Sequence, residues 1–280
     1  MTVSFLQCPH TILDLSTPHV MGILNVTPDS FSDGGKFFNA EDALKQVQRM
    51  IDDGASIIDV GGESTRPGAK DVSLEDELNR VIPVIKAIKE KFDILVSVDT
   101  SKAQVMEQSI LAGADIINDV RALQNEGCVE VMAKYPKVPI CLMHMQGLPR
   151  TMQENPQYDD VVGDIIEFFK QRIAVLSNAG IDKQRVMLDP GFGFGKTLTQ
   201  NYELLGRLSE FMSLELPLFI GISRKSMIGN LLNREVNERL AGSLTAAVIS
   251  AQQGAKIIRV HDVPETVDAL KVLAATQQSS

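Results

Sequence analysis

Cysteine is scarce in this 280-residue chain, and its three cysteines, Cys8, Cys128 and Cys141, form no CxxC pair. This excludes a disulfide scaffold and favours a reducing compartment. No apolar run approaches the roughly 20 residues that span a bilayer. The first residues also lack the charged and apolar regions of a signal peptide. The sequence therefore predicts a cytoplasmic protein with no membrane partner.

Positive charge is also in deficit. The chain has 27 Lys and Arg against 36 Asp and Glu, which gives a formal net charge of −9. Nonspecific nucleic-acid binding needs clustered cations, so we expect no nucleic-acid partner. A local basic pocket is still compatible with an acidic surface. The chain also has no internal repeat, no low-complexity segment and no GxGxxG motif in its first βα unit.

Short apolar runs of β type alternate with longer helical patterns along nearly the whole chain. The runs are almost continuous in Val, Ile and Leu, which is typical of parallel strands buried on both faces. The predicted strands are His19–Val26, Ser56–Gly62, Ile94–Thr100, Ile116–Val120, Pro139–Met145, Val186–Gly191, Leu218–Ser223 and Lys256–Asp262.

Helical patterns such as Ala40–Asp53 and Asp159–Ala179 separate these strands. Eight such units in alternation predict an α/β fold, a (β/α)8 TIM barrel over about residues 19–276 within a single domain, 1–280. Residues 1–18 precede the barrel, and we expect them to form a lid on its bottom. An open doubly wound sheet is the alternative, but no long gap splits the chain in two.

Polar residues stand at the C-terminal ends of all eight predicted strands, where barrels of this class place their chemistry. Any one of them, such as Asp99, could simply cap the next helix. Capping does not account for the whole set together with two Gly-rich loops. The set includes Asn25, Asp59, Asp99, Asn118, His144, Asp189, Ser223, Arg259 and His261.

The types of these side chains indicate a ligand. A carboxylate such as Asp189 accepts from two parallel N–H donors, which the 2-amino-4-oxo edge of a pterin offers. The amide of Asn118 can donate and accept at the same edge, and Asp99 can accept a further ring N–H. Arg259 and His261 are two residues apart on the last strand, so their side chains point to the same side. Two cationic groups on one side suit a phosphate or diphosphate.

Two segments resemble the signature segments of the dihydropteroate synthase family. They are Asn25-Val-Thr-Pro-Asp-Ser-Phe-Ser-Asp-Gly-Gly and Asp59-Val-Gly-Gly-Glu-Ser-Thr-Arg-Pro-Gly. Further family motifs follow in the same order, so the resemblance runs from about Val20 to Asp262. These motifs are Ser97-Val-Asp-Thr, Ile117-Asn-Asp, Asp189-Pro-Gly-Phe-Gly-Phe-Gly-Lys, Ser223-Arg-Lys-Ser and Arg259-Val-His-Asp.

The resemblance implies a transferase of folate biosynthesis. Its substrates would be a dihydropterin diphosphate and 4-aminobenzoate, its cofactor Mg²⁺, its inhibitors sulfonamides and its assembly a homodimer. It also implies roles for individual residues. These are Asn25 for the metal; Asp33, Asp99 and Lys225 for catalysis; Thr65, Asp99, Asn118, Met143, Asp189, Lys225, Arg259 and His261 for the pterin diphosphate; and Phe31, Arg66, Pro67, Phe194 and Ser226 for 4-aminobenzoate.

Two other functions remain alternatives. One is a pterin-binding barrel of the methyltetrahydrofolate:corrinoid methyltransferase type, and the other is a catalytically silent pterin-binding subunit. A separate motif, Gly195-Lys196-Thr197, is similar to the end of a P-loop. The earlier glycine of that motif would fall at Pro190, so an ATP site is not predicted.

Overall fold

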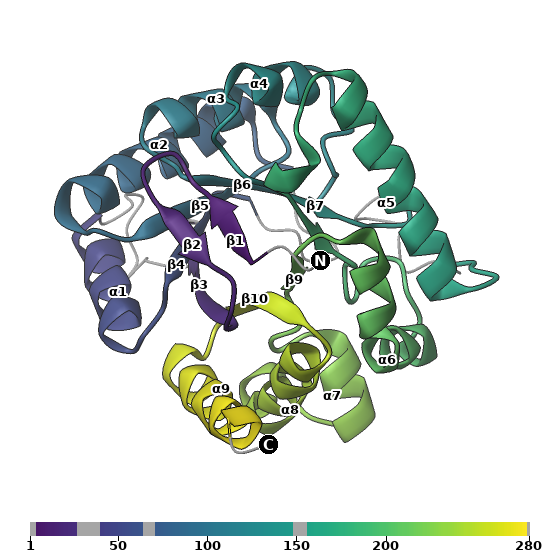
Figure 1. Cartoon of the computed structure of the whole chain (residues 1–280). Coiled ribbons are helices and arrows are strands. Elements are labelled where there is room, and N and C mark those ends of the chain that lie inside the picture. The colour runs from purple at the N-terminus through teal and green to yellow at the C-terminus, as the bar shows by residue number, and fades with distance from the viewer. Residues whose placement is uncertain (1–3, 27–39, 64–70, 148–155, 279–280) are drawn as a thin grey trace.

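The computed structural model describes residues 4–26, 40–63, 71–147 and 156–278. Eight parallel strands close into a barrel in the order β10-β3-β4-β5-β6-β7-β8-β9 (Figure 1), which confirms the predicted TIM barrel. The strands are β3 (His19–Asn25), β4 (Ile57–Gly61), β5 (Leu95–Asp99), β6 (Ile116–Asp119), β7 (Ile140–Met143), β8 (Val186–Asp189), β9 (Leu218–Ile220) and β10 (Ala255–Val260).

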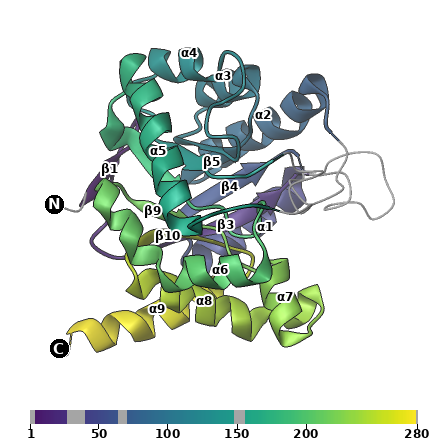
Figure 2. The same ribbon diagram turned by 90° about the vertical axis from the view of Figure 1, so that its right-hand side faces the viewer.

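Helices follow the strands and cover the outside of the barrel (Figures 1 and 2). They are α1 (Ala40–Asp52), α2 (Leu74–Lys91), α3 (Ala103–Leu111), α4 (Cys128–Lys134), α5 (Val161–Asn178), α6 (Leu198–Gly206), α7 (Ser226–Leu232), α8 (Leu240–Gln252) and α9 (Val263–Gln278), with short 3₁₀ turns η1 (Lys183–Arg185), η2 (Leu208–Leu214) and η3 (Val236–Glu238). The prediction of one helix per strand is wrong between β9 and β10, where α7 and α8 both lie. Within the described residues, no helix is long and apolar enough to cross a bilayer.

Several strands end earlier than predicted, and β8 shows why. We predicted that it would run to Gly191, but it ends at Asp189. Pro190 has no backbone N–H to donate to a ladder, and Gly191 adopts a positive φ of 73°. The chain therefore leaves the sheet at once, and the polar residues that follow belong to the loop above the barrel.

Side chains inside the barrel form layers, because successive residues of a strand point alternately in and out. Every strand contributes one residue to the lowest apolar layer. These residues are Met21, Ile57, Leu95, Ile116, Cys141, Met187, Phe219 and Ile257.

A two-stranded antiparallel hairpin closes this end of the barrel (Figure 1). It consists of β1 (Phe5–Gln7) and β2 (Ile12–Asp14). Its inward residues Leu6 and Leu13 are buried in the same cluster as the lowest layer, together with Cys8 and Leu15. This hairpin is the lid predicted for the first residues, and among the described residues the polar side chains inside the barrel converge toward the opposite end.

Candidate active site

The second layer inside the barrel contains five polar side chains, whereas the first is apolar. Two residues further along each strand, the period of two brings a different set of side chains to the interior. They are Ile23, Asp59, Ser97, Asn118, Met143, Asp189, Gly221 and Arg259. Buried polar groups are stable only when they are paired, so the contacts within this layer show how the site is built.

Arg259 is the centre of the polar layer. Its Nε donates to Asp59 Oδ2 at 2.6 Å, and its Nη2 donates to Asp99 Oδ2 at 3.0 Å. The side chain of Asp59 is 0% exposed, that of Asp99 is 9% exposed and that of Arg259 is 20% exposed. We predicted a cationic pair of Arg259 with His261. Instead, the guanidinium turns inward and binds two carboxylates.

His261 lies outside the barrel proper, just past the end of β10, and is exposed. Its Nδ1 is 3.1 Å from the Oγ of Ser223, which follows β9. Its backbone N–H donates to the same oxygen at 3.3 Å. His261 is therefore two residues from Arg259 in the chain, but its imidazole lies next to Ser223.

Asn118 and Asp189 occupy the same layer as Asp59. The Nδ2 of Asn118 donates weakly to Asp59 Oδ2 at 3.4 Å. Asp189 Oδ1 accepts the backbone N–H of Gly191 at 2.8 Å. Each carboxylate oxygen has two lone pairs, so Asp189 can still accept from a ligand while it holds the loop that follows β8.

The pKa of Asp99 is raised to about 7, first because it is buried and against the opposing effect of Arg259. Burial also raises the pKa of Asp189, while the nearby Lys225 lowers it. Burial lowers the pKa of Lys225 to about 8, against the opposing charge of Asp189. Two carboxyls and one amine with shifted pKa values at one end of a barrel are typical of a functional site.

Lys225 lies over an aromatic ring at the mouth. Its Nζ is 4.3 Å from the centre of the Phe194 ring and donates to the carbonyl of Phe192. Phe194 and Met143 are buried in one small apolar cluster, against which Val120 and Met145 pack. Together they form an apolar wall beside the polar side chains of the second layer, which is what a flat heteroaromatic ligand requires.

Asn25 and Ser226 stand at the edges of this group. Asn25 is the last residue of β3, and its Oδ1 would be 3.8 Å from a Cβ at Gly61, on the neighbouring strand. Ser226 is exposed and begins α7, directly after Lys225. The other five predicted residues, Phe31, Asp33, Thr65, Arg66 and Pro67, lie outside the described residues.

Asp59 was placed among the polar strand ends from the sequence but was given no role of its own. It joins Arg259 and Asn118 through one oxygen, Oδ2, while its Oδ1 is buried without a hydrogen-bond partner. The signal was present, because Asp59 lies two residues after Ile57 on a strand and so faces the interior. Its partner Arg259 could not be identified from the sequence, because 200 positions separate them.

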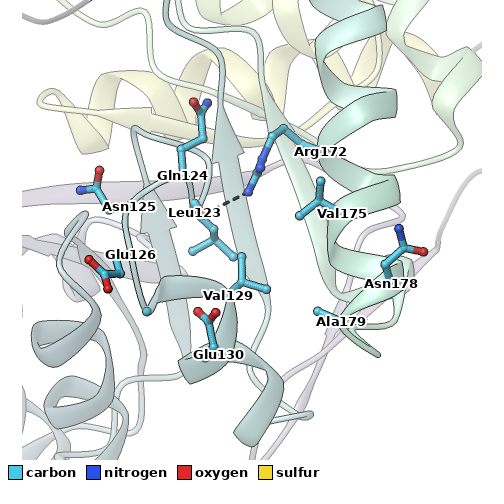
Figure 3. A pocket seen from close by; sticks show the side chains of 11 residues that line it. Leu123, Gln124, Asn125, Glu126, Val129, Glu130, Arg172, Val175, Asn178 and Ala179 are labelled. Carbon is cyan, nitrogen blue, oxygen red and sulfur yellow. Dashed lines mark hydrogen bonds between the residues drawn. The ribbon is translucent and has the colours of Figure 1, made fainter.

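A surface hollow elsewhere on the molecule is lined by α4, by the segment before it and by α5 (Figure 3). Its central cation, Arg172, already donates to the carbonyls of Ala122 at 2.9 Å and Leu123 at 3.0 Å. Burial lowers the pKa of Arg172, and the two carbonyls engage its Nε and Nη2. This hollow brings none of the predicted site residues together, so we place the active site at the barrel mouth.

Comparison with known proteins shows the family to which the chain belongs. Residues 21–261 match the model of the pterin binding enzyme family. The dihydropteroate synthase of Escherichia coli (strain K12) is 60% identical over 266 residues, which are 95% of this chain and 94% of that protein. The dihydropteroate synthase of Haemophilus influenzae is 53% identical over 264 residues, 94% of this chain and 96% of the relative.

Solved structures give the same result. Yersinia pestis dihydropteroate synthase in a sulfonamide drug complex superposes with a TM-score of 0.93 at 55% identity, covering 98% of this chain and 99% of that one. Xanthomonas albilineans dihydropteroate synthase with 4-aminobenzoic acid has a TM-score of 0.92 at 48% identity, covering 99% of both chains. The chain therefore belongs to the pterin-binding enzyme family, and within it to the dihydropteroate synthases.

Proposed function

We propose that this chain transfers the methylene-linked dihydropterin of (7,8-dihydropterin-6-yl)methyl diphosphate to 4-aminobenzoate, giving 7,8-dihydropteroate and diphosphate. The observation that carries the proposal is the polar layer at the barrel mouth, where Arg259 lies between Asp59 and Asp99. The related Xanthomonas albilineans structures with 4-aminobenzoic acid and with 7,8-dihydropteroate support the choice of substrates.

The pterin ring would lie between the apolar wall and the polar layer. Asp189 would accept from the exocyclic amine and the ring N3–H, and Asn118 would both donate and accept at the next positions. Lys225 is near Asp189 and would donate to the ring carbonyl or a ring nitrogen. Met143 and Phe194 would cover the flat face.

The diphosphate would bind at Arg259. A guanidinium has five N–H donors in a planar fork, and the contacts with Asp59 and Asp99 engage only Nε and Nη2. Nη1 would then donate to the diphosphate, while the bond from Nε to Asp59 holds the guanidinium in place. Release of Nη2 from Asp99 would free that carboxylate to accept a pterin N–H, which couples the two halves of the substrate.

Mg²⁺ is the proposed cofactor, with Asn25 as the residue that would hold it. Mg²⁺ is usually bound by one or two protein oxygens together with substrate phosphates and water. The amide oxygen of Asn25, at a strand end beside Gly61, fits that mode. The described residues contain no group of three or more His, Cys, Asp or Glu that could hold a metal by themselves, so the phosphates would complete the site. When bound, the ion would neutralise charge on the leaving diphosphate.

The chemical step would be dissociative. The bond between the pterin methylene and the diphosphate oxygen breaks, and its electron pair leaves with the diphosphate, whose charge Arg259 stabilises. Positive charge grows on the methylene and spreads into the dihydropterin, where ionised Asp99 and Asp189 stabilise it. The amine of 4-aminobenzoate then forms the new C–N bond and loses a proton to solvent.

The predicted homodimer and the cytoplasmic location belong to this proposal. Exposed apolar side chains on α7 and η3, Leu231 at 57%, Leu232 at 44% and Val236 at 48%, offer a surface for a second copy. Light scattering after size exclusion should give the mass of two chains, and Leu231→Glu should shift it toward one. The three free, buried thiols support a reducing compartment, and cell fractionation tests it.

Diphosphate release with and without 4-aminobenzoate tests the proposed reaction. With 4-aminobenzoate present, we expect diphosphate and 7,8-dihydropteroate to form in equal amounts, and a sulfonamide to compete with 4-aminobenzoate. Arg259→Ala should weaken binding of the diphosphate substrate far more than that of a pterin without phosphate. Pterin binding without dihydropteroate formation would refute the proposal in favour of a silent subunit, and methyl transfer to a corrinoid would indicate the other alternative.

A further inference from the structure

Lys196 is a buried lysine just behind the active site that the proposed reaction does not use. It ends the loop after β8, and its motif with Gly195 and Thr197 is similar to the end of a P-loop. The structure places its ammonium in the interior, because Lys196 is only 2% exposed. Thr197 caps α6 through a capping box. The motif is therefore built differently from a phosphate cradle, and the lysine must serve another purpose.

The ammonium of Lys196 has three acceptors, one for each of its N–H bonds. It donates to the carbonyl of Gly191 at 2.9 Å and to that of Phe194 at 3.1 Å. The third contact is with Nδ1 of His144, also at 3.1 Å. These contacts tie two points of the loop after β8 to the residue that follows β7.

While Lys196 is charged, Nδ1 of His144 accepts from it, because an ammonium can only donate, and the ring proton is then on Nε2. Burial lowers the pKa of Lys196 to about 7, against the opposing charge of Asp189. Burial and the charge of Lys196 lower the pKa of His144 well below its usual value, which agrees with this tautomer. The ring also packs edge-on against Phe168 at 4.9 Å and 84°, which fixes its orientation.

The loop that Lys196 holds is the one that holds Lys225. Phe192, whose carbonyl accepts from Lys225, lies between the two carbonyls bound by Lys196. The ring of Phe194, under the Lys225 ammonium, belongs to one of the two pinned residues. The N–H of Gly191, on the other pinned residue, donates to Asp189 at 2.8 Å. Each element around the proposed pterin slot on this side therefore depends on the same loop.

We propose that Lys196 and His144 form a positioning pair that sets the loop of residues 191–194, and through it places Lys225 and Phe194 at the pterin slot. The proposal deepens the proposed function, because it rests on Lys225 and Phe194 acting on the pterin substrate. It assigns no direct substrate contact to Lys196. The role of Lys196 differs from a purely structural one because the residues that it binds, Gly191 and Phe194, flank or contact the groups that hold Lys225.

The chain supplies a matched control on the same loop. Tyr158 donates from its hydroxyl to the carbonyl of Gly195 at 2.8 Å, and Asn201 accepts the N–H of Gly193 at 2.7 Å. These bonds keep the loop anchored when Lys196 is replaced, so Lys196→Met should fold. Tyr158→Phe removes only the hydrogen bond to Gly195, keeps the ring that packs against His144 at 6.0 Å, and leaves the bonds of Lys196 to Gly191 and Phe194 in place.

Steady-state kinetics and binding of the folded enzyme test the pair. For Lys196→Met we expect KM for the dihydropterin diphosphate to rise at least 10-fold, because Lys225 and Phe194 are no longer held at the pterin slot. Tyr158→Phe keeps the Lys196 contacts, so its KM should stay within about 2-fold of the parent's. His144→Leu should act in the same direction as Lys196→Met. His144→Asn keeps an acceptor at the δ position and should restore most of the parent's KM.

A second measurement does not depend on turnover. Amine acetylation followed by mass spectrometry reports the reactivity of Lys225 against pH. In His144→Leu, which leaves every charge in place, we expect Lys225 to be acetylated more rapidly than in the parent because its contacts with Phe192 and Phe194 loosen. Tyr158→Phe should leave that rate unchanged. If the parent made no dihydropteroate, the proposed function would fail, yet this comparison would still report on the pair.

Three results would overturn the proposal. Parent-like KM and parent-like Lys225 reactivity in folded Lys196→Met would show that the pair positions nothing at the site. Equal effects of His144→Asn and His144→Leu would show that the acceptor is irrelevant. Loss of affinity for inorganic diphosphate alone in Lys196→Met, measured by calorimetry, would mean that Lys196 contacts the anion directly.

Discussion

Replacing Arg259 by methionine should destabilise the fold mainly because it leaves Asp59 and Asp99 buried without a counter-charge. The change keeps an apolar stem of similar length and removes only the guanidinium. The two broken contacts are short, at 2.6 Å to Asp59 and 3.0 Å to Asp99. Removing one partner from a buried ion pair typically costs about 3–5 kcal/mol, because an uncompensated charge stays behind.

A double-mutant cycle separates that charge effect from lost packing. In the Asp59→Asn/Asp99→Asn background no carboxylate is left unpaired, so Arg259→Met should cost only about 1 kcal/mol. The coupling should therefore be about 2–4 kcal/mol. Urea unfolding at pH 8, followed by circular dichroism, measures each free energy of unfolding. Equal costs of Arg259→Met in the two backgrounds would refute the argument.

The pH dependence gives an independent check. Asp99 in the parent has a pKa of about 7, above its ordinary value of 3.8, mainly because it is buried, and Arg259 opposes this shift. Loss of Arg259 should raise that pKa further. Below pH about 7 the Asp99 carboxyl is protonated in both folded proteins, so its part of the difference disappears. Above pH 7 only the parent holds it ionised against a partner, so the stability gap should widen as the pH rises.

Three further outcomes are expected. Asp189→Asn replaces an acceptor by a donor and should weaken pterin binding by about 1–3 kcal/mol in calorimetry with the circular dichroism spectrum unchanged; parent-like affinity would remove Asp189 from the pterin site. Because burial lowers the pKa of Lys225 to about 8, pterin affinity should decline above that pH, and Lys225→Met should lose this alkaline limb in a pH titration. Gly191→Ala should prevent folding, since its Cβ would be 1.9 Å from the His144 carbonyl oxygen at a φ of +73°. Gly206→Ala has nothing within 4 Å of its Cβ, so its free energy of unfolding should stay within about 1 kcal/mol of the parent's. Similar soluble yields and melting temperatures for the two glycine variants would contradict this.

The barrel could be predicted because its signals are local. Strands buried on both faces require continuous apolar runs, and closure brings their C-terminal ends to one rim whatever the helices outside do. Asn118, Asp189 and Arg259 could therefore be assigned to one site without coordinates. The extra helix α7 was missed because it occupies a loop, where neither closure nor strand pairing constrains the chain.

Pairing among the charges was decided only by the tertiary structure. The sequence placed Asp59, Asp99 and Arg259 at strand ends on one rim of the barrel, but only the closed barrel decides which of these side chains touch. The inward turn of Arg259 follows from the cost of leaving two buried carboxylates unpaired, which no local pattern records. Lys196 is a similar case, because its local sequence is similar to that of a phosphate-binding lysine. The three acceptors that hold it inside come from two loops that only the folded barrel brings together.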